Sequence, residues 1–255
     1  MKSIPKCYGI IPARYKSSRF PGKPLAEILG KPMFWHVYDR ARQCRELSEV
    51  VLATDDERIE AAAKALNVPV VMTRDDHPSG TDRVLEAARI LQVPEGAVVV
   101  NIQGDEPTLE PDMLTTLVQP FVSPQIQVTT LAKRIDRSES ESPDRVNAVF
   151  SRSGKGLYFS RSLVPYSGEG ETTGYYEHVG LYAFRLEILE RFVELGPSPL
   201  EIAEKLEMLR LIENDIPIQV EIIEHESVCV ERPEDIDVAE RILMEKRRRI
   251  EELQI

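Results

Sequence analysis

Residues 7–24 read CYGIIPARYKSSRFPGKP, an apolar run followed directly by a basic loop. The run Cys7–Ile11 predicts a short buried strand. The loop Pro12–Pro24 contains no acidic residue and four cations, namely Arg14, Lys16, Arg19 and Lys23. Because α/β sheets bind ligands at the carboxyl ends of their strands, this basic loop is a candidate site for a compact polyanion. A solvated surface loop is the alternative that charge alone leaves open.

The basic loop carries groups that suit a triphosphate. Arginine and lysine pair with phosphate oxygens through charge-assisted hydrogen bonds. Ser17 and Ser18 add hydroxyl donors, and Gly22 lets the backbone approach a ligand closely. The sequence has no G-x-x-x-x-G-K-[ST] P-loop, and no G-x-G-x-x-G follows the first strand. The second absence counts against a dinucleotide-dependent dehydrogenase.

Composition excludes several other classes of protein. The 255 residues are 42% hydrophobic, enough to bury one large core or two small ones. The formal charge of −11 argues against nucleic acid or an anionic membrane as a partner. No apolar run reaches the roughly 18 residues of a membrane span, and the first residues lack the apolar segment of a secretory signal. Three scattered cysteines suit a reducing compartment, so we expect a cytoplasmic protein.

In the first half of the chain, short apolar strands alternate with helices. This alternation predicts β-α-β crossovers and a parallel sheet. The expected strands after the first are 50–53, 68–72, 97–102 and 128–132. The expected helices are 31–41, 57–66, one that ends near 91 with a cap from Ser79, Thr81 or Asp82, and 111–121.

In the second half this rhythm changes. Three strand-like runs, at 146–150, 157–160 and 178–184, follow one another without a long helix between them. They predict an antiparallel insertion or subdomain. Helices are expected again at about 186–194, at 200–213 and from Pro233 onward, with a late strand at 218–223.

Two carboxylates, Asp105 and Glu106, follow the most strand-like run in the chain. Hard cations such as Mg²⁺ take oxygen ligands and accompany phosphates, so this pair is a candidate metal site. The alternative is that one of them caps the helix expected at 111–121.

Several motifs taken together resemble one family. Besides the basic loop, these motifs are 79–83 (SGTDR), 101–107 (NIQGDEP), 157–162 (LYFSRS), 178–182 (HVGLY), 197–201 (PSPLE) and 232–235 (RPED). With these motifs in this order, the chain resembles the cytidylyltransferases that activate 3-deoxy-manno-octulosonate (Kdo). The resemblance covers nearly the whole chain.

The resemblance implies a fold and a reaction. The fold would be a single three-layer α/β nucleotidyltransferase domain over residues 1–255, with a mixed, mostly parallel sheet. Residues 146–184 would form a small antiparallel insertion used for homodimerisation. The reaction would join CMP from CTP to an acidic sugar, with Mg²⁺ as cofactor and pyrophosphate as the other product, for lipopolysaccharide synthesis.

The resemblance also implies roles for individual residues. The catalytic ones would be Arg14, Lys23 and Asp105. Those expected to hold the nucleotide are Ala13, Arg14, Ser17, Ser18, Arg19, Lys23, Arg74, Ser79, Gly80, Thr81 and Gln103. Those expected to meet the sugar acid are Gln103, Asn147, Arg161, His178, Tyr182, Glu207 and Met208. The metal would be held by Asp105 together with Glu231.

Three positions depart from the family pattern. Asn147 stands where Lys is usual, Met208 where Gln is usual, and Glu231 where Asp is usual. The first two changes remove a cation and an amide from the acceptor side, so a different acidic acceptor, such as a modified Kdo, a sialate-like acid or a phosphonate, is one alternative. Another is a nucleotide-binding protein without turnover. His178 could also be an ordinary core histidine.

Overall fold

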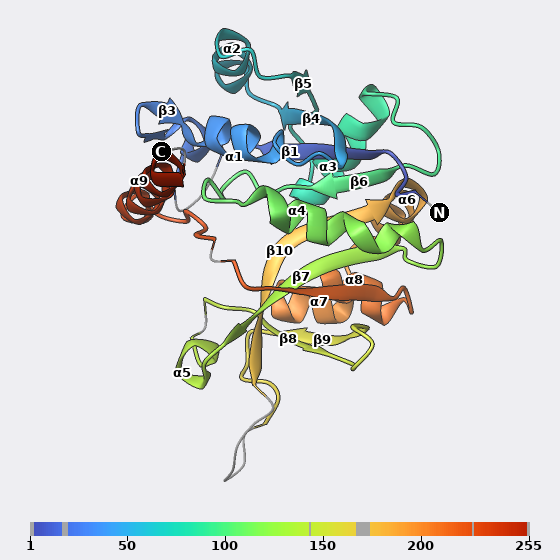
Figure 1. The fold of residues 1–255 in the computed structure, drawn as a ribbon. Helices are drawn as coiled ribbons and strands as arrows, with labels where there is room; N and C mark the ends of the chain where they lie inside the picture. The colour runs from blue at the N-terminus through green and yellow to red at the C-terminus, as the bar shows by residue number, and fades with distance from the viewer. Residues whose placement is uncertain (1–2, 17–19, 143, 167–173, 226, 254–255) are drawn as a thin grey trace. The chain divides into compact units, whose positions relative to one another are not determined.

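The computed structural model describes the whole chain except residues 1–2, 17–19, 143, 167–173, 226 and 254–255, with the backbone alone for 249–253. The chain forms two compact units (Figure 1). Unit 1 contains Met1–Cys7, Val93–Val100 and Thr115–His225, and unit 2 contains Tyr8–Gln92, Asn101–Leu114 and Glu226–Ile255. None of the helices among the described residues combines the length and the apolar character that crossing a membrane requires.

Unit 2 is built on three strands in the order β1-β4-β5. They are β1 (Cys7–Ala13), β4 (Leu47–Thr54) and β5 (Val70–Met72), and β4 and β5 run parallel. The helices of this unit are α1 (Met33–Ala41), α2 (Glu57–Ala65), α3 (Gly80–Ile90) and α9 (Asp235–Leu253), with a short 3-10 turn, η1, at Lys23–Leu25. Alternation of strand and helix is what the sequence predicts here.

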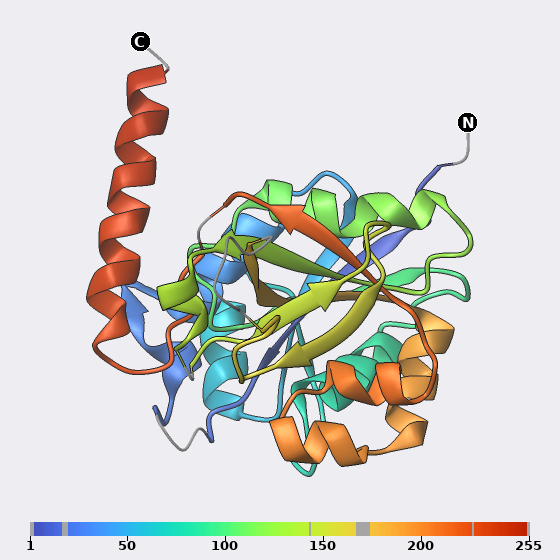
Figure 2. The ribbon, with the colours of Figure 1, turned by 90° about the horizontal axis from the view of Figure 1, so that it is seen from below.

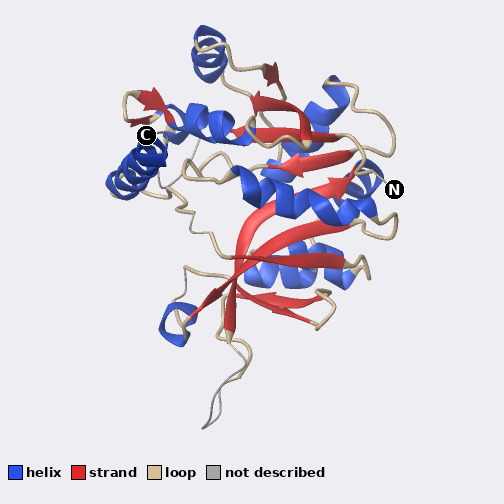
Figure 3. Ribbon diagram, in the orientation of Figure 1, coloured by secondary structure: helices blue, strands red, loops and turns tan. Residues whose placement is uncertain are grey.

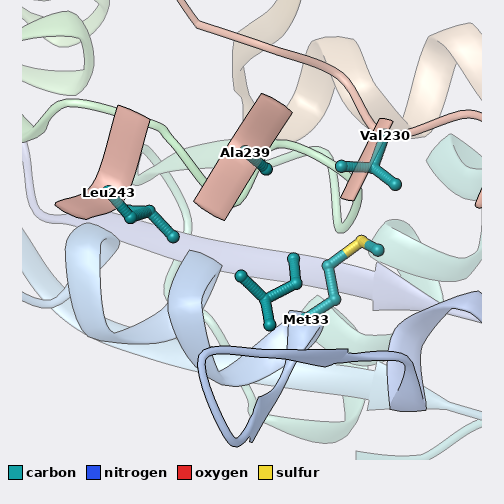
Figure 4. Packing of buried hydrophobic residues seen from close by; sticks show 5 residues of the cluster. Met33, Val230, Ala239 and Leu243 are labelled. Carbon is teal, nitrogen blue, oxygen red and sulfur yellow. The ribbon is translucent and has the colours of Figure 1, made fainter. Parts of the chain in front are cut away.

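The C-terminal helix α9 joins unit 2 through a small apolar cluster (Figure 4). Its buried residues Ala239 and Leu243 pack with Val230 against Ile28 and Met33. Figure 2 shows the C-terminal end of α9 extending away from the other elements of this unit. The cluster therefore fixes the first half of the helix, and with it the segment around Val230.

A two-stranded hairpin, β2 (Glu27–Ile28) with β3 (Lys31–Pro32), lies before α1 and was not expected from the sequence. Its two-residue turn has positive φ at both positions, 48° at Leu29 and 75° at Gly30. Glycine adopts this conformation easily and leucine does not. Gly30 was therefore a signal for the turn in the sequence, but Leu29 beside it made that signal weak.

Unit 1 holds the strands β11-β7-β10-β6 in that order. Their bounds are β6 (Val98–Asn101), β7 (Val128–Ile135), β10 (Tyr175–Arg185) and β11 (Ile218–Ile223). Strand β7 pairs antiparallel with β10 and parallel with β11, so the sheet is mixed. Figure 3 shows β7 and β10 running side by side. The helix α4 (Pro111–Val118) and the turn η2 (Gln119–Val122) precede β7.

The expected antiparallel part is confirmed. Strands β8 (Asn147–Phe150) and β9 (Gly156–Ser160) form an antiparallel pair, and β8 also contacts β10. Strand β10 is longer than the sequence indicated, because its first half pairs with the far end of β7 as well. Its register shifts between Val179 and Tyr182. Such bulges are frequent beside functional sites because they redirect side chains.

The prediction of a single helix at 200–213 was wrong. The structure has two, α7 (Pro199–Glu204) and α8 (Met208–Glu213), after α6 (Leu186–Leu195). Lys205 ends α7 in the left-handed conformation, with φ 58° and ψ 46°. No glycine or proline marks this break, so the apolar periodicity alone could not show it. A short helix, α5 (Arg137–Ser140), was also not expected.

A buried ion pair joins α7 to α8. Arg210, 3% exposed, donates from Nη2 and Nε to the two carboxylate oxygens of Glu201, at 2.6 and 2.8 Å. The same guanidinium donates to the carbonyl of Phe192 at 3.0 Å and lies 4.0 Å from the centre of its ring. Every contact is made inside unit 1, so the pair holds the turn between α7 and α8 against α6.

We therefore expect Arg210→Met to destabilise the protein by about 3–5 kcal/mol, because it leaves the carboxylate of Glu201 buried without its partner. Arg137→Met breaks an exposed pair with Glu141 and should cost less than about 1 kcal/mol. Urea unfolding of both variants measures the difference. Equal and small effects would mean that the buried pair contributes little to holding α7 and α8.

Candidate active site

In unit 2, the basic loop meets the segment after β6 through one ion pair. The Nζ atom of Lys23 donates to the Oδ2 atom of Asp105 at 2.6 Å, and both side chains are mostly buried. Lys23 begins η1, and Asp105 lies in the turn that follows Gln103. Helix α4 begins only at Pro111, so Asp105 is not its cap. The structure thus rejects the capping alternative for Asp105.

The ion pair depends on a close approach of two backbone segments. The N–H of Ile102 donates to the carbonyl of Ile10 at 2.9 Å, which places Ile102 beside β1. At Gly104, an added Cβ atom would lie 2.8 Å from the carbonyl oxygen of Pro12. Only glycine allows this approach, and it brings Asp105 to the loop that carries Lys23.

The described part of the basic loop closes on itself. Gly22, with φ 74°, donates its N–H to the carbonyl of Tyr15 at 2.9 Å. The Tyr15 ring packs against Gly22 on one side, and the guanidinium carbon of Arg58 lies 3.3 Å from the ring centre. The expected ligands Ser17, Ser18 and Arg19 lie outside the described residues. Arg14 is exposed at the start of the loop.

The segment before α9 brings a second carboxylate toward Asp105. The N–H of Val230 donates to the carbonyl of Asp105 at 2.8 Å, and the next residue is Glu231. Cys229 precedes Val230 in the chain, and the pKa of its thiol is raised by desolvation first and then by the charges of Asp105 and Glu106, with a further contribution from Glu231. Several carboxylates therefore share one neighbourhood in unit 2.

The metal expected from the sequence is Mg²⁺, which needs few protein ligands. Among the described residues there is no group of three or more His, Cys, Asp or Glu side chains that could hold a metal. Mg²⁺ commonly takes only one or two carboxylates and completes its coordination with substrate phosphates and water. Asp105 and Glu231 are the candidates for those two ligands.

The N-terminus of α3 provides a further group of expected nucleotide ligands. Ser79 caps the helix, and its Oγ atom accepts the N–H groups of Thr81 at 3.1 Å and Asp82 at 3.3 Å. The buried Thr81 accepts a hydrogen bond from Asn101 Nδ2 at 3.1 Å. A helix N-terminus carries a partial positive charge, which favours an anionic or polar ligand there.

A buried arginine organises the ends of β4 and β5. Arg83 is 3% exposed, and its Nη2 atom lies 3.3 Å from Oδ1 of Asp55, directly after β4. It also donates to the Thr73 hydroxyl and, at 3.2 Å, to the carbonyl of Arg74. Burial lowers the pKa of Arg83, Asp55 opposes this, and the charge of Arg14 adds to it. Arg83 thus holds the ends of β4 and β5 in unit 2.

In unit 1, His178 is part of the core. It is 8% exposed, its Nε2 atom lies 2.9 Å from the Thr130 hydroxyl, and its ring packs edge-on against Phe159, with 5.0 Å between centres. Desolvation lowers the pKa of His178 to about 3. Tyr182 lies 5.3 Å from it, ring to ring, and the register shift of β10 lies between the two residues. These observations agree with the core-histidine alternative.

Tyr182 and Glu207 lie near one another in unit 1. Burial raises the pKa of Tyr182 strongly, and the negative charge of Glu207 raises it further. Arg161 is exposed at the end of β9, where its Nε atom donates to the carbonyl of Glu204 at 3.2 Å. Of these residues, Arg161 is therefore exposed, whereas Tyr182 is only 7% exposed.

Two of the expected acceptor residues have structural positions instead. Asn147 is fully buried, and its Nδ2 atom donates to the carbonyls of Ser140 and Ser162, both at 3.0 Å. Both of its N–H donors are therefore used inside unit 1. Met208 is 4% exposed among buried apolar side chains at the start of α8. A role for either side chain in contacting the sugar is not supported by these positions.

Comparison with known proteins identifies the family. The sequence matches the family described as Cytidylyltransferase over residues 8–223. It is 59% identical over 243 residues to the 3-deoxy-manno-octulosonate cytidylyltransferase of Nitratidesulfovibrio vulgaris, with 94% of this chain and 96% of that protein covered. The corresponding enzyme of Oleidesulfovibrio alaskensis is 58% identical over 241 residues, covering 94% and 97%. The chain belongs to the 3-deoxy-manno-octulosonate cytidylyltransferase family.

A solved structure agrees with this assignment. It is described as CMP:2-keto-3-deoxy-manno-octonic acid synthetase complexed with CTP, and it is 40% identical with a TM-score of 0.90. The alignment covers 94% of this chain and 99% of that one. Membership makes this chain a nucleotidyltransferase, as the motifs predicted.

Sequence reasoning missed several residues that shape the site of this family member. They are Asp55, Arg83, Asn101 and Glu204, none of which the motifs had marked as a ligand. A signal for Arg83 was present, since it lies one helical turn before Ala87 on the buried face of α3. A charged residue on a buried face requires a partner, and Asp55 follows the neighbouring strand.

We expect His178 to remain neutral from about pH 8 down to pH 5, because the folded protein protonates it only at about 3. The unfolded chain protonates this residue near its ordinary value of 6.5, so its contribution to stability is complete above that pH and declines as pH falls toward 3. NMR titration of the imidazole, assigned with His178→Gln, measures this. A midpoint near 6.5 would contradict the buried, neutral assignment.

Proposed function

We propose that this enzyme transfers CMP from CTP to the anomeric hydroxyl of Kdo, giving CMP-Kdo and pyrophosphate. The observation that carries the proposal is the Lys23–Asp105 pair in a chain 59% identical to a named Kdo cytidylyltransferase. A place in lipopolysaccharide synthesis and in the cytoplasm follows from the same proposal, and the absence of a membrane-spanning helix in the described residues is consistent with it.

In the reaction, the anomeric oxygen of the sugar bonds to the α-phosphorus of CTP while the bond to the β-phosphate oxygen breaks. The hydroxyl proton is released, and negative charge grows on the departing pyrophosphate. Of the cations in the described part of the basic loop, Lys23 and Arg14 would neutralise this charge. Lys23 is already fixed by Asp105, so little reorganisation is needed when the charge develops.

Asp105 and Glu231 would hold Mg²⁺ in this proposal. When bound, the ion would neutralise phosphate charge and orient the triphosphate. Thr81 and the capped N-terminus of α3 would bind the nucleoside, with Ser79, Gly80, Arg74 and Ala13 beside them. Gln103, which accepts the Glu106 N–H at its carbonyl, is proposed to contact both the nucleotide and the sugar.

The acceptor is proposed to be Kdo itself. The departures at Asn147 and Met208 suggested an altered acceptor site, but both side chains are buried and engaged within unit 1. Neither therefore removes a group that would face the sugar. Arg161 and Glu207 are the polar side chains proposed to meet the sugar acid, since Tyr182 is 7% exposed and buried like His178.

Pyrophosphate release with CTP, Mg²⁺ and a panel of sugar acids tests the proposal. We expect the highest kcat/KM with Kdo, and we expect Met208→Gln to give no gain with Kdo, because residue 208 is buried. A better rate with another sugar acid or a phosphonate would identify a different acceptor. No release with any of them would favour a nucleotide-binding protein without turnover.

We expect Asp105→Asn to lower kcat by about a hundredfold or more while the melting temperature stays within a few degrees, because a carboxylate proposed to hold Mg²⁺ at the triphosphate is lost. Asp112→Asn, at an exposed position in the first turn of α4, is the matched control and should keep the wild-type rate. Near-wild-type turnover by Asp105→Asn would remove Asp105 from the proposed site.

A homodimer built on the antiparallel segment 146–184 is also proposed. Supporting it, β9 is an outer strand in the described pairing, and Leu157 on this strand is 51% exposed. Sedimentation should show a dimer at micromolar concentration, and Leu157→Lys should shift it toward monomer. A wild-type protein that sediments only as a monomer would rule the dimer out.

A further inference from the structure

Donors from one strand end converge on the carboxylate of Glu204, the last residue of α7. Its Oε1 atom accepts the Ser160 hydroxyl at 2.7 Å and the Tyr158 hydroxyl at 3.3 Å. Its Oε2 atom accepts the backbone N–H of Arg161 at 3.0 Å. Both oxygens of this half-buried carboxylate are therefore engaged by the end of β9.

Arg161 is held by the same residue a second time. Its Nε atom donates to the backbone carbonyl of Glu204 at 3.2 Å, although the side chain as a whole is exposed. A long, exposed arginine side chain ordinarily keeps considerable rotamer freedom. Here the backbone N–H and the Nε atom of Arg161 both donate hydrogen bonds to Glu204. The guanidinium is therefore held near the end of β9 before any ligand binds.

The charge of Glu204 strengthens this arrangement. Burial acts to raise the pKa of Glu204, but the hydrogen bonds from the Arg161 backbone and from Ser160 outweigh it and lower the pKa. The carboxylate is therefore ionised at neutral pH, and the bonds that it accepts are charge-assisted.

Glu204 is also the fixed point from which a second polar residue is placed. Lys205 ends α7 in the left-handed conformation, and the N–H of Leu206 donates to the carbonyl of Glu201 at 3.3 Å. This turn leads directly to Glu207, whose charge acts on Tyr182. One residue thus ties the strand end that carries Arg161 to the turn that carries Glu207.

We infer that Glu204 is a positioning residue for the acceptor, which acts by holding the Arg161 guanidinium in the orientation that pairs with the carboxylate of the sugar acid. The inference rests on the proposed function, in which Arg161 meets that acid. Glu204 does not bind the sugar itself, because its two oxygens are occupied by β9 and its charge would repel an anion. Its effect passes through Arg161.

The first experiment compares Glu204→Gln with wild type in the pyrophosphate assay. Glutamine keeps the length of the side chain but has only one acceptor oxygen, so it cannot receive the Ser160 and Arg161 donors on separate atoms. We expect KM for Kdo to rise about tenfold, the scale of one lost charge-assisted hydrogen bond, with KM for CTP unchanged. Glu204→Asp, which keeps the charge on a shorter side chain, should fall between the two.

Glu213→Gln is the matched control. Glu213 lies in unit 1 and also accepts a backbone N–H, but the donor is Leu200, at 2.9 Å, and not a residue at the end of β9. It should keep the wild-type KM for Kdo. A rise equal to that of Glu204→Gln would mean that any loosened carboxylate on α7 or α8 has this effect, and would overturn the inference.

A double-mutant cycle distinguishes positioning from a merely structural role. If Glu204 acts through Arg161, then Glu204→Gln should change KM for Kdo no further in an Arg161→Ala background. Additive effects would overturn the inference. Hydrogen exchange at the Arg161 amide is a readout that does not depend on activity: it should be faster in Glu204→Gln, and an unchanged rate would also overturn the inference.

The proposed function can fail separately. Wild-type protein that releases no pyrophosphate with any sugar acid would overturn both proposals, because Arg161 would then have no acid to meet. An active wild type whose KM for Kdo is unaffected by Glu204→Gln would overturn only the role of Glu204.

Discussion

The ion pair between Lys23 and Asp105 is the interaction around which unit 2 is arranged. An acidic side chain and a basic one, 82 positions apart in the sequence, come within 2.6 Å because Gly104 lets the turn after β6 lie against the carbonyl of Pro12. Neither charge is fully solvated, so each depends on the other in the absence of substrate. The pair therefore keeps a cation and a carboxylate ready at the carboxyl end of β1, where a triphosphate and its metal would need them.

Other contacts in unit 2 hold neighbouring segments of the chain in place. Arg83 ties the ends of β4 and β5 together, and the cluster of Ile28, Met33 and Val230 holds the segment that leads to Glu231. In unit 1, polar contacts also hold segments of the chain in place. There, the ion pair of Arg210 with Glu201 fixes the turn between α7 and α8, and Glu204 fixes the end of β9. In both units, buried polar contacts fix neighbouring chain segments, and groups that are held in place lose less entropy on binding a ligand.

Local patterns predicted most of the fold. The strand-helix alternation, the antiparallel segment and the Ser79 cap were all readable, because each depends on periodicity or on one capping side chain. The break at Lys205 was not, because a non-glycine residue adopts the left-handed conformation there for tertiary reasons. The same holds for the site. Lys23 and Asp105 could be found from charge and position, whereas Arg83 and Glu204 owe their importance to partners that only the folded chain brings near. Asn147 and Met208 misled the prediction, since a departure from a family pattern does not reveal whether a side chain is buried.

The claim on which this account depends most is that Lys23 and Asp105 together form the triphosphate site. Calorimetric titration of CTP, with and without Mg²⁺, into wild type, Lys23→Ala and Asp105→Asn tests it directly, with Lys64→Ala on the exposed side of α2 as the control. The account predicts that Lys23→Ala weakens CTP binding about tenfold or more. It also predicts that Asp105→Asn removes the dependence of binding on Mg²⁺ and that the control behaves as wild type. CTP binding by both variants with wild-type affinity and wild-type Mg²⁺ dependence would contradict it.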